Sequence, residues 1–225
     1  MIHFLDPNRP DEPFPPVEQA ELEPNGLLAV GGDLSSTRLL NAYRCGIFPW
    51  YSDDQPILWW SPDPRTVLYP DQLKISRSLG KTLRNKPFTV TVDQAFSRVM
   101  EACSAPRKNE PGTWITGEML AAYRELHRIG YAHSVEVWME ERLIGGLYGV
   151  ALDRVFFGES MFSIERDASK VALVQLTRLL QRQGFRLIDC QVYSAHLISL
   201  GAQEIARSRF CRELERWCTP APSPV

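Results

Sequence analysis

The spacing of apolar positions changes between a helix period and a strand period along the chain, and it predicts where each kind of element lies. Apolar positions three or four residues apart, such as Met119, Tyr123 and Leu126, indicate one buried helix face. A Ser, Thr or Asp ahead of such a run favours a helix start, because its side-chain oxygen accepts a free backbone N–H. Helices are therefore predicted to begin at Asp33 or Ser35, at Ser76, Asp93 and Thr116, and at Asp167 or Ser169. Shorter helices are predicted to end at Gly201 and Trp217.

Alternation with period two predicts three strands that follow one another closely, at residues 134–139, 143–151 and 155–158. Short polar turns connect these strands, so they predict an antiparallel meander. A helix and a further strand, 186–192, come next, and this strand must run parallel to one strand of the meander. The arrangement belongs to the α+β class. Shorter strands are expected at 57–60, 66–69 and 88–92.

The N-terminal part differs in character from the rest of the chain. Pro13, Pro15 and Pro16 restrict their own backbone and that of their predecessors, so the first 30 residues are predicted to form an extended arm. The turn Ser61-Pro62-Asp63-Pro64 then predicts a domain boundary. We expect a small N-terminal domain at residues 1–64 and a larger domain at residues 65–225.

The composition excludes several classes of protein. Of the 225 residues, 44% are hydrophobic and 23% are charged, as is typical of globular proteins. No run of about 20 apolar residues is present, so no membrane-spanning helix is expected. Five widely spaced cysteines without a C-x-x-C pair predict neither a metal site nor a disulfide framework. The start of the chain lacks signal-peptide features, and reduced thiols fit the cytoplasm, where we expect the protein.

Charge is unevenly distributed, although the net charge is only −2 and the sequence pI is about 6.1. Residues 1–64 carry a net charge of −7, residues 65–108 carry +6 and residues 109–225 carry −1. The middle segment is therefore a candidate polyanion-binding surface, although its spacing also fits an ordinary solvated helix face. Its candidate residues are Lys74, Arg77, Lys81, Arg84 and Lys86.

A carboxylate and an amide interrupt the otherwise apolar strand Leu187–Val192. Asp189 and Gln191 are two positions apart, so an unbroken strand would place both on the same face. Burial of either group without a partner costs free energy. The two residues therefore either face a cavity or form a satisfied structural pair.

A second carboxylate, Glu159, lies where the last meander strand ends, within the apolar segment 156–162. This end of a mixed sheet can open toward a ligand, and Glu159 would then stand beside an apolar pocket. The alternative is a Glu on an edge strand that faces solvent. Together with Asp189, Glu159 would suit a cationic amine that has a hydrophobic partner.

Two further patterns carry less chemistry than they first indicate. Cys190 and His196 resemble a nucleophile and its base, but alternation points Cys190 away from Asp189 and toward the core, where a lone cysteine usually serves packing. The glycine-rich stretch 145–149 lies inside a strand pattern with no helix after it. Close approach of another backbone or of a ligand is therefore favoured over a phosphate site. The four histidines show no metal-ligand spacing.

Four tryptophans divide between two roles. Trp50 and Trp114 lie in loops, where an exposed ring can stack on a nucleobase. Trp59 and Trp60 lie on a predicted strand, where core packing is the default.

Five motifs then occur in an order and spacing that resemble one known family. They are Gly46-Ile47-Phe48-Pro49-Trp50, Leu58–Arg65 (LWWSPDPR), Gly112–Ile115 (GTWI), Gly158–Ser163 (GESMFS) and Leu187–Gln191 (LIDCQ). From about Phe14 to Trp217 the chain resembles the leucyl/phenylalanyl-tRNA–protein transferases.

The resemblance implies a bacterial cytoplasmic aminoacyltransferase. Such an enzyme moves Leu or Phe, and less well Met, from aminoacyl-tRNA to the α-amino group of proteins that begin with Arg or Lys, which marks them for N-degron proteolysis. The implied fold is a small N-terminal domain followed by an N-acetyltransferase-like domain, in which a splayed mixed sheet is flanked by helices.

The resemblance also implies roles for individual positions. Trp50 and Trp114 would contact the 3′-terminal adenosine, with Tyr43 nearby. Asp189, Gln191 and Glu159 would be catalytic or bind the acceptor, and the proton could pass through one of them or through the tRNA ribose. The substrate pocket would include Phe156, Ser160, Met161, Leu173, Leu176 and Ile188.

The aminoacyl ester is already activated, so no metal, cofactor or covalent enzyme intermediate is expected. The basic segment would hold tRNA phosphates, and neither DNA nor a membrane is expected as a partner. One alternative is a coenzyme-A-dependent N-acetyltransferase, although the turn 163–168 has no glycine and two acids where pyrophosphate would bind. The other is a non-catalytic adaptor for a peptide or a tRNA.

Overall fold

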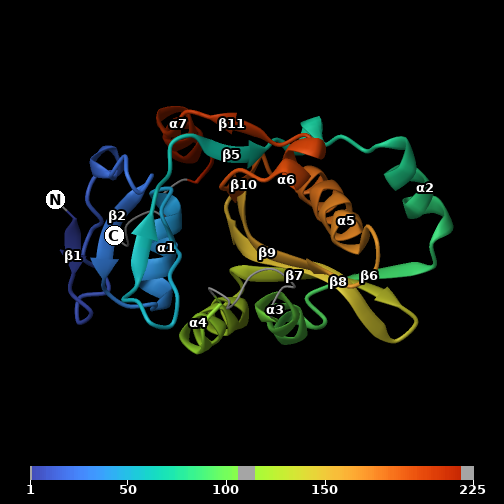
Figure 1. Cartoon of the computed structure of the whole chain (residues 1–225), viewed down its shortest axis with the longest axis horizontal. Helices are drawn as coiled ribbons and strands as arrows, with labels where there is room; N and C mark the ends of the chain where they lie inside the picture. Colours follow the sequence, from blue (N-terminus) through green and yellow to red (C-terminus); the bar gives the residue numbers. More distant parts are fainter. Residues whose placement is uncertain (1, 106–114, 219–225) are drawn as a thin grey trace.

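Two β-sheets hold the strands of this chain, a small sheet near the N-terminus and a large mixed sheet (Figure 1). The structure is a computed structural model, and it describes residues 2–105 and 115–218. The small sheet has the order β1-β2-β4-β3, with β1 parallel to β2 and the other pairs antiparallel. This part contains β1 (His3–Leu5), the 3₁₀ turn η1 (Val17–Gln19), β2 (Leu27–Gly31), α1 (Ser36–Arg44), β3 (Phe48–Pro49) and β4 (Leu58–Trp60).

The predicted extended arm at the N-terminus needs a correction. Residues 10–16 are free of helix, as their prolines require, but the segments on either side form β1, η1 and β2. β1 pairs with β2 in parallel, with His3 opposite Ala29 and Leu5 opposite Gly31. This pairing joins segments that are distant in sequence, so local composition could not predict it.

Among the described residues, the large sheet contains seven strands in the order β11-β5-β10-β9-β8-β7-β6. The predicted meander is confirmed, because β7, β8 and β9 pair antiparallel in sequence order. The predicted parallel pairing is confirmed too, because β10 runs parallel to β9. The fold is therefore α+β, as predicted. The strands are β5 (Arg65–Leu68), β6 (Phe88–Val92), β7 (Ala132–Met139), β8 (Arg142–Leu152), β9 (Val155–Ser163), β10 (Leu187–Gln191) and β11 (Gln203–Ile205).

Helices flank both faces of the large sheet (Figure 1). On one face α3 packs against β8 and β9 and α4 packs against β7, and on the other face α5 packs against β7, β8 and β9. None of the helices in the described ranges has the length and apolar character needed to cross a bilayer. The helices are the 3₁₀ turn η2 (Pro70–Gln72), α2 (Arg77–Asn85), α3 (Phe96–Ser104), α4 (Gly117–Arg128), α5 (Ala168–Arg182), α6 (Ala195–Ser199) and α7 (Arg207–Trp217).

Three predicted helix starts are confirmed by single hydrogen bonds. The side chains of Ser35, Ser76 and Thr116 each accept the backbone N–H three residues later. The prediction that Asp93 caps α3 is wrong. Its carboxylate instead accepts the backbone N–H of Ser134 on β7, at 2.8 Å, so it ties a loop to the sheet.

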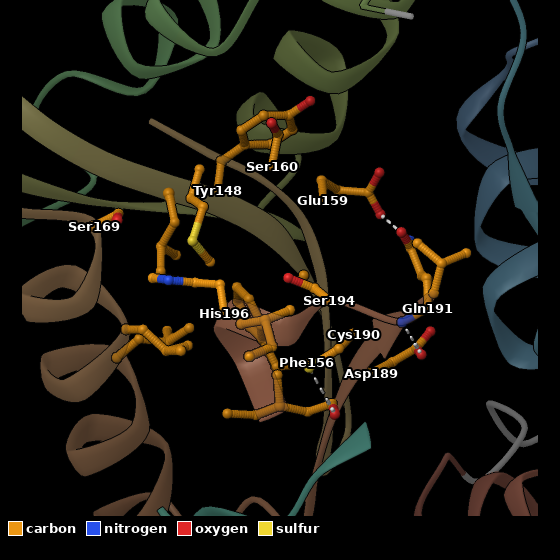
Figure 2. A pocket seen from close by; sticks show the side chains of 18 of the residues that line it. Tyr148, Phe156, Glu159, Ser160, Ser169, Asp189, Cys190, Gln191, Ser194 and His196 are labelled. Atoms are coloured by element: carbon orange, nitrogen blue, oxygen red, sulfur yellow. Dashed lines mark hydrogen bonds between the residues drawn. The ribbon is translucent and has the colours of Figure 1, made fainter. Parts of the chain in front are cut away.

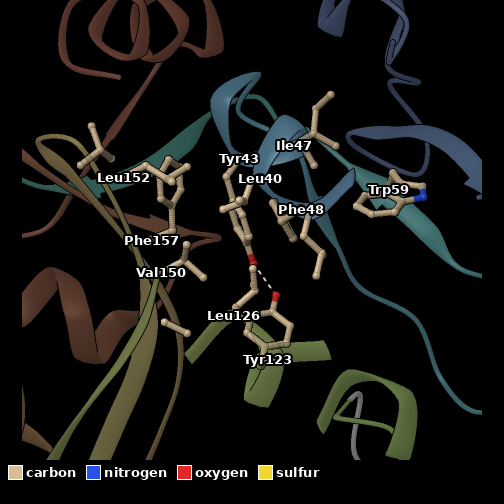
Figure 3. Close-up of a cluster of buried hydrophobic side chains, with 14 of the residues drawn as sticks. Leu40, Tyr43, Ile47, Phe48, Trp59, Tyr123, Leu126, Val150, Leu152 and Phe157 are labelled. Carbon is tan, nitrogen blue, oxygen red and sulfur yellow. Dashed lines mark hydrogen bonds between the residues drawn. The ribbon is translucent and has the colours of Figure 1, made fainter. Parts of the chain in front are cut away.

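One cluster of buried side chains extends from the small sheet into the large one (Figure 3). It includes Tyr43 of α1 and Phe48 of β3, and these pack with Tyr123 of α4 and Phe157 of β9. A second cluster lies beneath α5, on the opposite face of the large sheet. Because the first cluster crosses between the sheets, residues of the N-terminal part reach the middle of the molecule.

The large sheet opens where β9 and β10 diverge. These strands pair over three positions, from Val155 opposite Leu187 to Phe157 opposite Asp189. Beyond that point β9 continues along β8, whereas β10 shifts its register on β5. The divergence is the splay that the family resemblance implied, and it positions the site described below.

Close backbone approach explains the glycine-rich stretch of β8. A Cβ at Gly149 would lie only 2.2 Å from the carbonyl oxygen of Phe157, and a Cβ at Gly145 would lie 2.5 Å from the Cβ of Ala168. The prediction of a close approach, rather than a phosphate site, is confirmed.

Candidate active site

A cavity of about 690 Å³ lies at the opening between β9 and β10 (Figure 2). Side chains from β9, α5, β10 and α6 form most of its lining, and the loop after β3 adds Trp50. The cavity thus brings together the two clusters that the sequence singled out on separate strands. Ten predicted site residues line it: Trp50, Phe156, Glu159, Ser160, Met161, Leu173, Leu176, Ile188, Asp189 and Gln191.

One wall of the cavity is apolar. Phe156, Leu173, Leu176 and Ile188 are each at most 4% exposed, and they belong to the core cluster beneath α5. Leu147 of β8 adds to the same wall. An apolar ligand group placed here gains free energy by leaving water, whereas a polar group would lose its hydration.

Three side chains donate hydrogen bonds to Glu159. Its Oε1 accepts from the Tyr43 hydroxyl at 2.7 Å and from Gln191 Nε2 at 3.2 Å. Its Oε2 accepts from the Tyr123 hydroxyl at 2.9 Å, and the two phenols also lie within hydrogen-bond distance of each other (Figure 3). Glu159 is therefore held firmly at the cavity wall by donors from three different elements.

Burial raises the pKa of Glu159 from its ordinary 4.5 to about 7. The hydrogen bonds from Tyr43 and Tyr123 act in the opposite direction, and the nearby negative charge of Asp189 raises the value further. Burial, together with the Glu159 carboxylate, also raises the pKa of both phenols well above 10. Glu159 is thus the group at this wall that can exchange a proton near neutral pH.

Asp189 is fully buried and paired with Arg65 of β5. Arg65 Nε donates to Asp189 Oδ1 at 2.8 Å, and Arg65 Nη2 donates to Oδ2 at 2.7 Å. Asp189 Oδ1 also accepts the backbone N–H of Gln191 at 2.9 Å (Figure 2). Both carboxylate oxygens are therefore occupied within the protein.

Gln191 interrupts the regular strand. Its φ is +64°, and the register of β10 on β5 shifts between Asp189 and Gln191. Asp189 and Gln191 both line the cavity, but the strand between them is bulged and the two side chains have separate partners. Asp189 binds Arg65, whereas the Gln191 amide points to Glu159.

Cys190 and His196 both line the cavity, but they do not form a nucleophile and base. Cys190 is half-buried rather than enclosed in the core as predicted, and burial raises the pKa of its thiol. A thiol that stays protonated is a poor nucleophile. Burial also lowers the pKa of His196, whose Nε2 has no hydrogen-bond partner among the described residues.

Trp59 and Trp50 take the two roles that the sequence predicted, whereas Trp60 is only half-buried. Trp59 is fully buried and its Nε1 donates to the carbonyl oxygen of Gly31 at 2.9 Å. Trp50 is 44% exposed at the cavity, with its ring centroid 6.0 Å from that of Trp60. Trp60 Nε1 donates to the Trp50 carbonyl oxygen at 2.7 Å, so Trp60 fixes the position of the exposed ring. Trp114 lies outside the described residues.

The structure separates the remaining predicted residues from the cavity. Tyr43 is fully buried and does not line it, so its hydroxyl acts on Glu159 rather than reaching a ligand directly. The five basic residues are exposed on α2 and its flanks: Lys74, Arg77, Lys81, Arg84 and Lys86.

A hydrogen bond links α2 to Asp167, the residue before α5, and α5 borders the cavity. Thr82 Oγ1 on α2 donates to Asp167 at 3.2 Å, and Ser169 and Leu173 of α5 line the cavity. The basic face and the cavity are thus joined through one helix.

Arg65 and Tyr123 are site residues that sequence reasoning missed. Arg65 lies in the short strand β5, where a buried cation demands an anion such as Asp189. Tyr123 was predicted as a position of an apolar helix face, and it is buried as expected. Its hydroxyl is the signal that could have been used, because a buried phenol needs a hydrogen-bond partner.

Comparisons with known proteins show which family this chain is similar to. A sequence model of the family described as leucyl/phenylalanyl-tRNA protein transferase matches residues 67–215, and a model of that family's N-terminal domain matches residues 32–63. A leucyl/phenylalanyl-tRNA–protein transferase of Azoarcus sp. (strain BH72) is 61% identical over 212 residues, which cover 94% of this chain and 90% of the relative. One from Aromatoleum aromaticum is 61% identical over 224 residues, which cover 100% of this chain and 93% of the relative.

Among solved structures, a GCN5-related N-acetyltransferase from Kribbella flavida overlaps with a TM-score of 0.40 at 12% sequence identity. The overlap covers 74% of this chain and 60% of that protein.

Proposed function

The chain belongs to the leucyl/phenylalanyl-tRNA protein transferase family, and from this premise we propose that its cavity joins the aminoacyl end of Leu-tRNA or Phe-tRNA to the N-terminal amine of a protein that begins with Arg or Lys. One observation carries the proposal. A single cavity combines an apolar wall with a carboxylate, Glu159, whose pKa is about 7. The apolar wall suits the donor side chain, and the carboxylate suits a cationic acceptor.

The donor amino acid lies against Phe156, Leu173, Leu176 and Ile188. This wall accepts Leu or Phe, and it rejects polar side chains through their desolvation cost. Branching at Cβ is disfavoured by shape. Met is accepted less well. Trp50 supplies an exposed ring on which the terminal adenosine of the tRNA stacks, and stacking of this kind contributes roughly 1–3 kcal/mol.

The acceptor amine is held by Glu159 rather than by Asp189. Both oxygens of Asp189 are engaged by Arg65 and by the Gln191 backbone, so Glu159 is the carboxylate at the cavity wall whose charge has no ion-pair partner among the described residues. The Arg or Lys side chain of the acceptor extends toward the open side of the cavity. Acceptor specificity thus rests on charge as well as on the free amine.

The reaction needs two proton movements. The bound ammonium group gives one proton to the Glu159 carboxylate, whose pKa of about 7 is near the roughly 7.7–8.0 of an α-amino group. The free amine attacks the ester carbonyl carbon, a C–N bond forms, and the C–O bond to the terminal ribose breaks. The second amine proton passes to the leaving ribose oxygen. Gln191 orients Glu159 during these steps.

No covalent enzyme intermediate is part of the proposal. The ester is already activated, so the amine can attack it directly once both are held in line. The protonated thiol of Cys190 offers no competing nucleophile. Neither a metal nor a cofactor is assigned a step.

The wider setting follows from the two substrates. The basic residues on and around α2 hold the acceptor stem through its phosphates, without reading sequence. We place the reaction in the bacterial cytoplasm, where aminoacyl-tRNA is found. The added Leu or Phe marks the acceptor protein for N-degron proteolysis.

Transfer of a labelled amino acid tests the proposal. The purified chain is incubated with radiolabelled Phe-tRNA and with peptides that begin with Arg, Lys or Gly. We expect label in the Arg and Lys peptides and none in the Gly peptide. A parallel reaction with labelled acetyl-CoA tests the acetyltransferase alternative and should give no labelled peptide. Binding of Phe-tRNA without any transfer would instead favour the adaptor.

A further inference from the structure

We propose that Arg65 is a positioning residue for this reaction, because it holds the buried Asp189 side chain in place, and Asp189 fixes the backbone from which Gln191 reaches Glu159. The inference rests on the proposed function and extends it, since that function assigns Arg65 no role. Arg65 does not touch the substrate, and it acts through Asp189 and then Gln191.

Arg65 is enclosed by three parts of the chain. It is fully buried on β5, with its guanidinium carbon 4.7 Å from the ring centroid of Phe48 and 4.6 Å from that of Phe210. Phe48 belongs to β3 and Phe210 to α7, so the cation lies between two aromatic rings that are distant in sequence. Both rings thus restrict the space in which the guanidinium can move.

Asp189 is the ion-pair partner of Arg65 among the described residues. The pair is bidentate, so the two hydrogen bonds fix the orientation of the Asp189 carboxylate as well as compensating its charge. Nη1 of Arg65 is buried with no acceptor in the described part of the chain. Both side-chain hydrogen bonds of the guanidinium therefore go to Asp189. Within the described residues, neither side chain has a second ion-pair partner.

The fixed carboxylate holds an uncommon backbone conformation. Gln191 has a φ of +64°, a region that residues other than glycine adopt only when their surroundings require it. Two hydrogen bonds hold this conformation: the Gln191 N–H donates to Asp189 Oδ1 at 2.9 Å, and the Val192 N–H donates to the Cys190 carbonyl oxygen at 2.9 Å. Only the first depends on Asp189. The shifted register of β10 on β5 at this point removes the regular ladder that would otherwise fix the backbone.

The Gln191 side chain depends on this backbone. Its Nε2 lies 3.2 Å from Glu159 Oε1, near the upper limit for a hydrogen bond, so a small backbone shift breaks this bond. Glu159 would then lose one of its three donors and its orientation toward the amine. The expected defects are in the rate of transfer and in binding of the acceptor amine, which Glu159 holds. Binding of Phe-tRNA should be unchanged, because the apolar wall and Trp50 are untouched.

A double-mutant cycle tests the inference. The variants are Arg65→Met, Asp189→Asn and their combination, with Arg65→Lys as the conservative change. Arg38→Met is the matched control, because Arg38 is also fully buried and ion-paired, to Asp33, but lies away from the cavity. Each variant is assayed for kcat and for the KM of Phe-tRNA and of an Arg-initiated peptide, below its melting temperature.

We expect Arg65→Met to lower kcat about a hundredfold, the effect of misplacing a catalytic group by about 1 Å, with the KM of Phe-tRNA unchanged. Arg65→Lys should recover part of the loss. Asp189→Asn should match Arg65→Met, and the double variant should be no worse than either, because both act on one chain of contacts. Full kcat in Arg65→Met, multiplied losses in the double variant, or an equal loss in Arg38→Met would each overturn the inference.

Amide hydrogen exchange gives a readout that needs no activity. In Arg65→Met and Arg65→Lys the Gln191 N–H should exchange at least about fivefold faster, the equivalent of one lost hydrogen bond, and in Arg38→Met it should not. Unchanged exchange in both Arg65 variants would overturn the inference even if the wild-type chain transfers amino acids. Failure of the wild-type chain to transfer would instead refute the proposed function alone.

Discussion

Among single residues, Glu159 depends most on its surroundings for its chemistry. An exposed Glu is fully ionised at neutral pH, but burial brings the pKa of Glu159 to about 7 despite hydrogen bonds from two phenols. The charged form therefore accumulates as the pH rises through 7. Only this form can accept a proton from the acceptor amine.

The pH dependence of Glu159→Gln tests this role. We expect the wild-type kcat to increase through about pH 7 as Glu159 loses its proton, and the variant to lose that inflection. The kcat should fall about 10²-fold or more, as is usual when a general base is removed. Glu204→Gln is the matched control, because Glu204 is an exposed Glu on β11. A variant with the wild-type kcat would assign the proton to the tRNA ribose instead.

Among the elements, α2 and the middle strand of the meander, β8, illustrate two kinds of constraint. The exposed face of α2 carries Arg77, Lys81 and Arg84, while Leu79 anchors the helix in the core beneath α5. The α2 side chains are therefore free to bind an anion without disturbing the fold. Gly149 in β8 has the opposite character, because its surroundings leave no room for a side chain.

Charge reversal on α2 should weaken binding of all tRNAs alike. The triple variant is Arg77→Glu, Lys81→Glu, Arg84→Glu. The negative slope of log affinity against log salt should become shallower by about three, or one for each phosphate that the variant no longer neutralises. Filter binding at several salt concentrations measures it. The matched control reverses three exposed arginines of α7, which are Arg209, Arg212 and Arg216. An unchanged slope in the α2 variant would remove this face from the tRNA site.

Gly149→Ala should destabilise the protein. The new Cβ would collide with the Phe157 carbonyl oxygen and with the Phe156 ring, at 2.2 Å and 2.5 Å. We expect a loss of about 2 kcal/mol in the free energy of unfolding, measured by urea denaturation. Gly117→Ala at the start of α4 is the control, because nothing lies within 4 Å of its Cβ position, and it should be neutral or slightly stabilising. Equal stability of the two variants would contradict the packing described here.

The whole molecule assembles the site from both sheets. Glu159 of β9 is reached by Tyr43 of α1 and by Tyr123 of α4, while Arg65 is enclosed by Phe48 of β3 and Phe210 of α7. The core cluster that joins the sheets keeps these groups in register (Figure 3). The N-terminal part thus contributes side chains that contact residues of the cavity.

Tyr43→Phe tests this dependence across the molecule. Its hydrogen bond lowers the pKa of Glu159, so its removal should raise that pKa and move the kcat inflection to a pH above 7. Tyr69→Phe is the control, because the Tyr69 hydroxyl contacts Glu213 and Arg209 and not Glu159. A pH profile identical to that of the wild type would show that α1 does not influence the carboxylate.

The sequence predicted these features unevenly, for physical reasons. Caps such as Ser35 and Ser76 are local, so their helices could be predicted from neighbouring residues. Glu159, Asp189 and Gln191 could be collected because they lie in motifs that resemble one family, and the resemblance implied the apolar residues of the cavity. The β1–β2 pairing and the Arg65–Asp189 pair are long-range contacts, which no local pattern reveals. The bulge at Cys190 broke an alternation that the prediction for Gln191 had assumed.

The most direct measurement is the intact mass of peptide and enzyme after one reaction. Equal amounts of Phe-tRNA, Leu-tRNA and Val-tRNA are mixed with the purified chain and an Arg-initiated peptide. The account predicts peptide heavier by one Phe or one Leu residue, none heavier by Val, and an enzyme of unchanged mass. Peptide of unchanged mass, or an enzyme that carries the amino acid, would contradict direct transfer at this cavity.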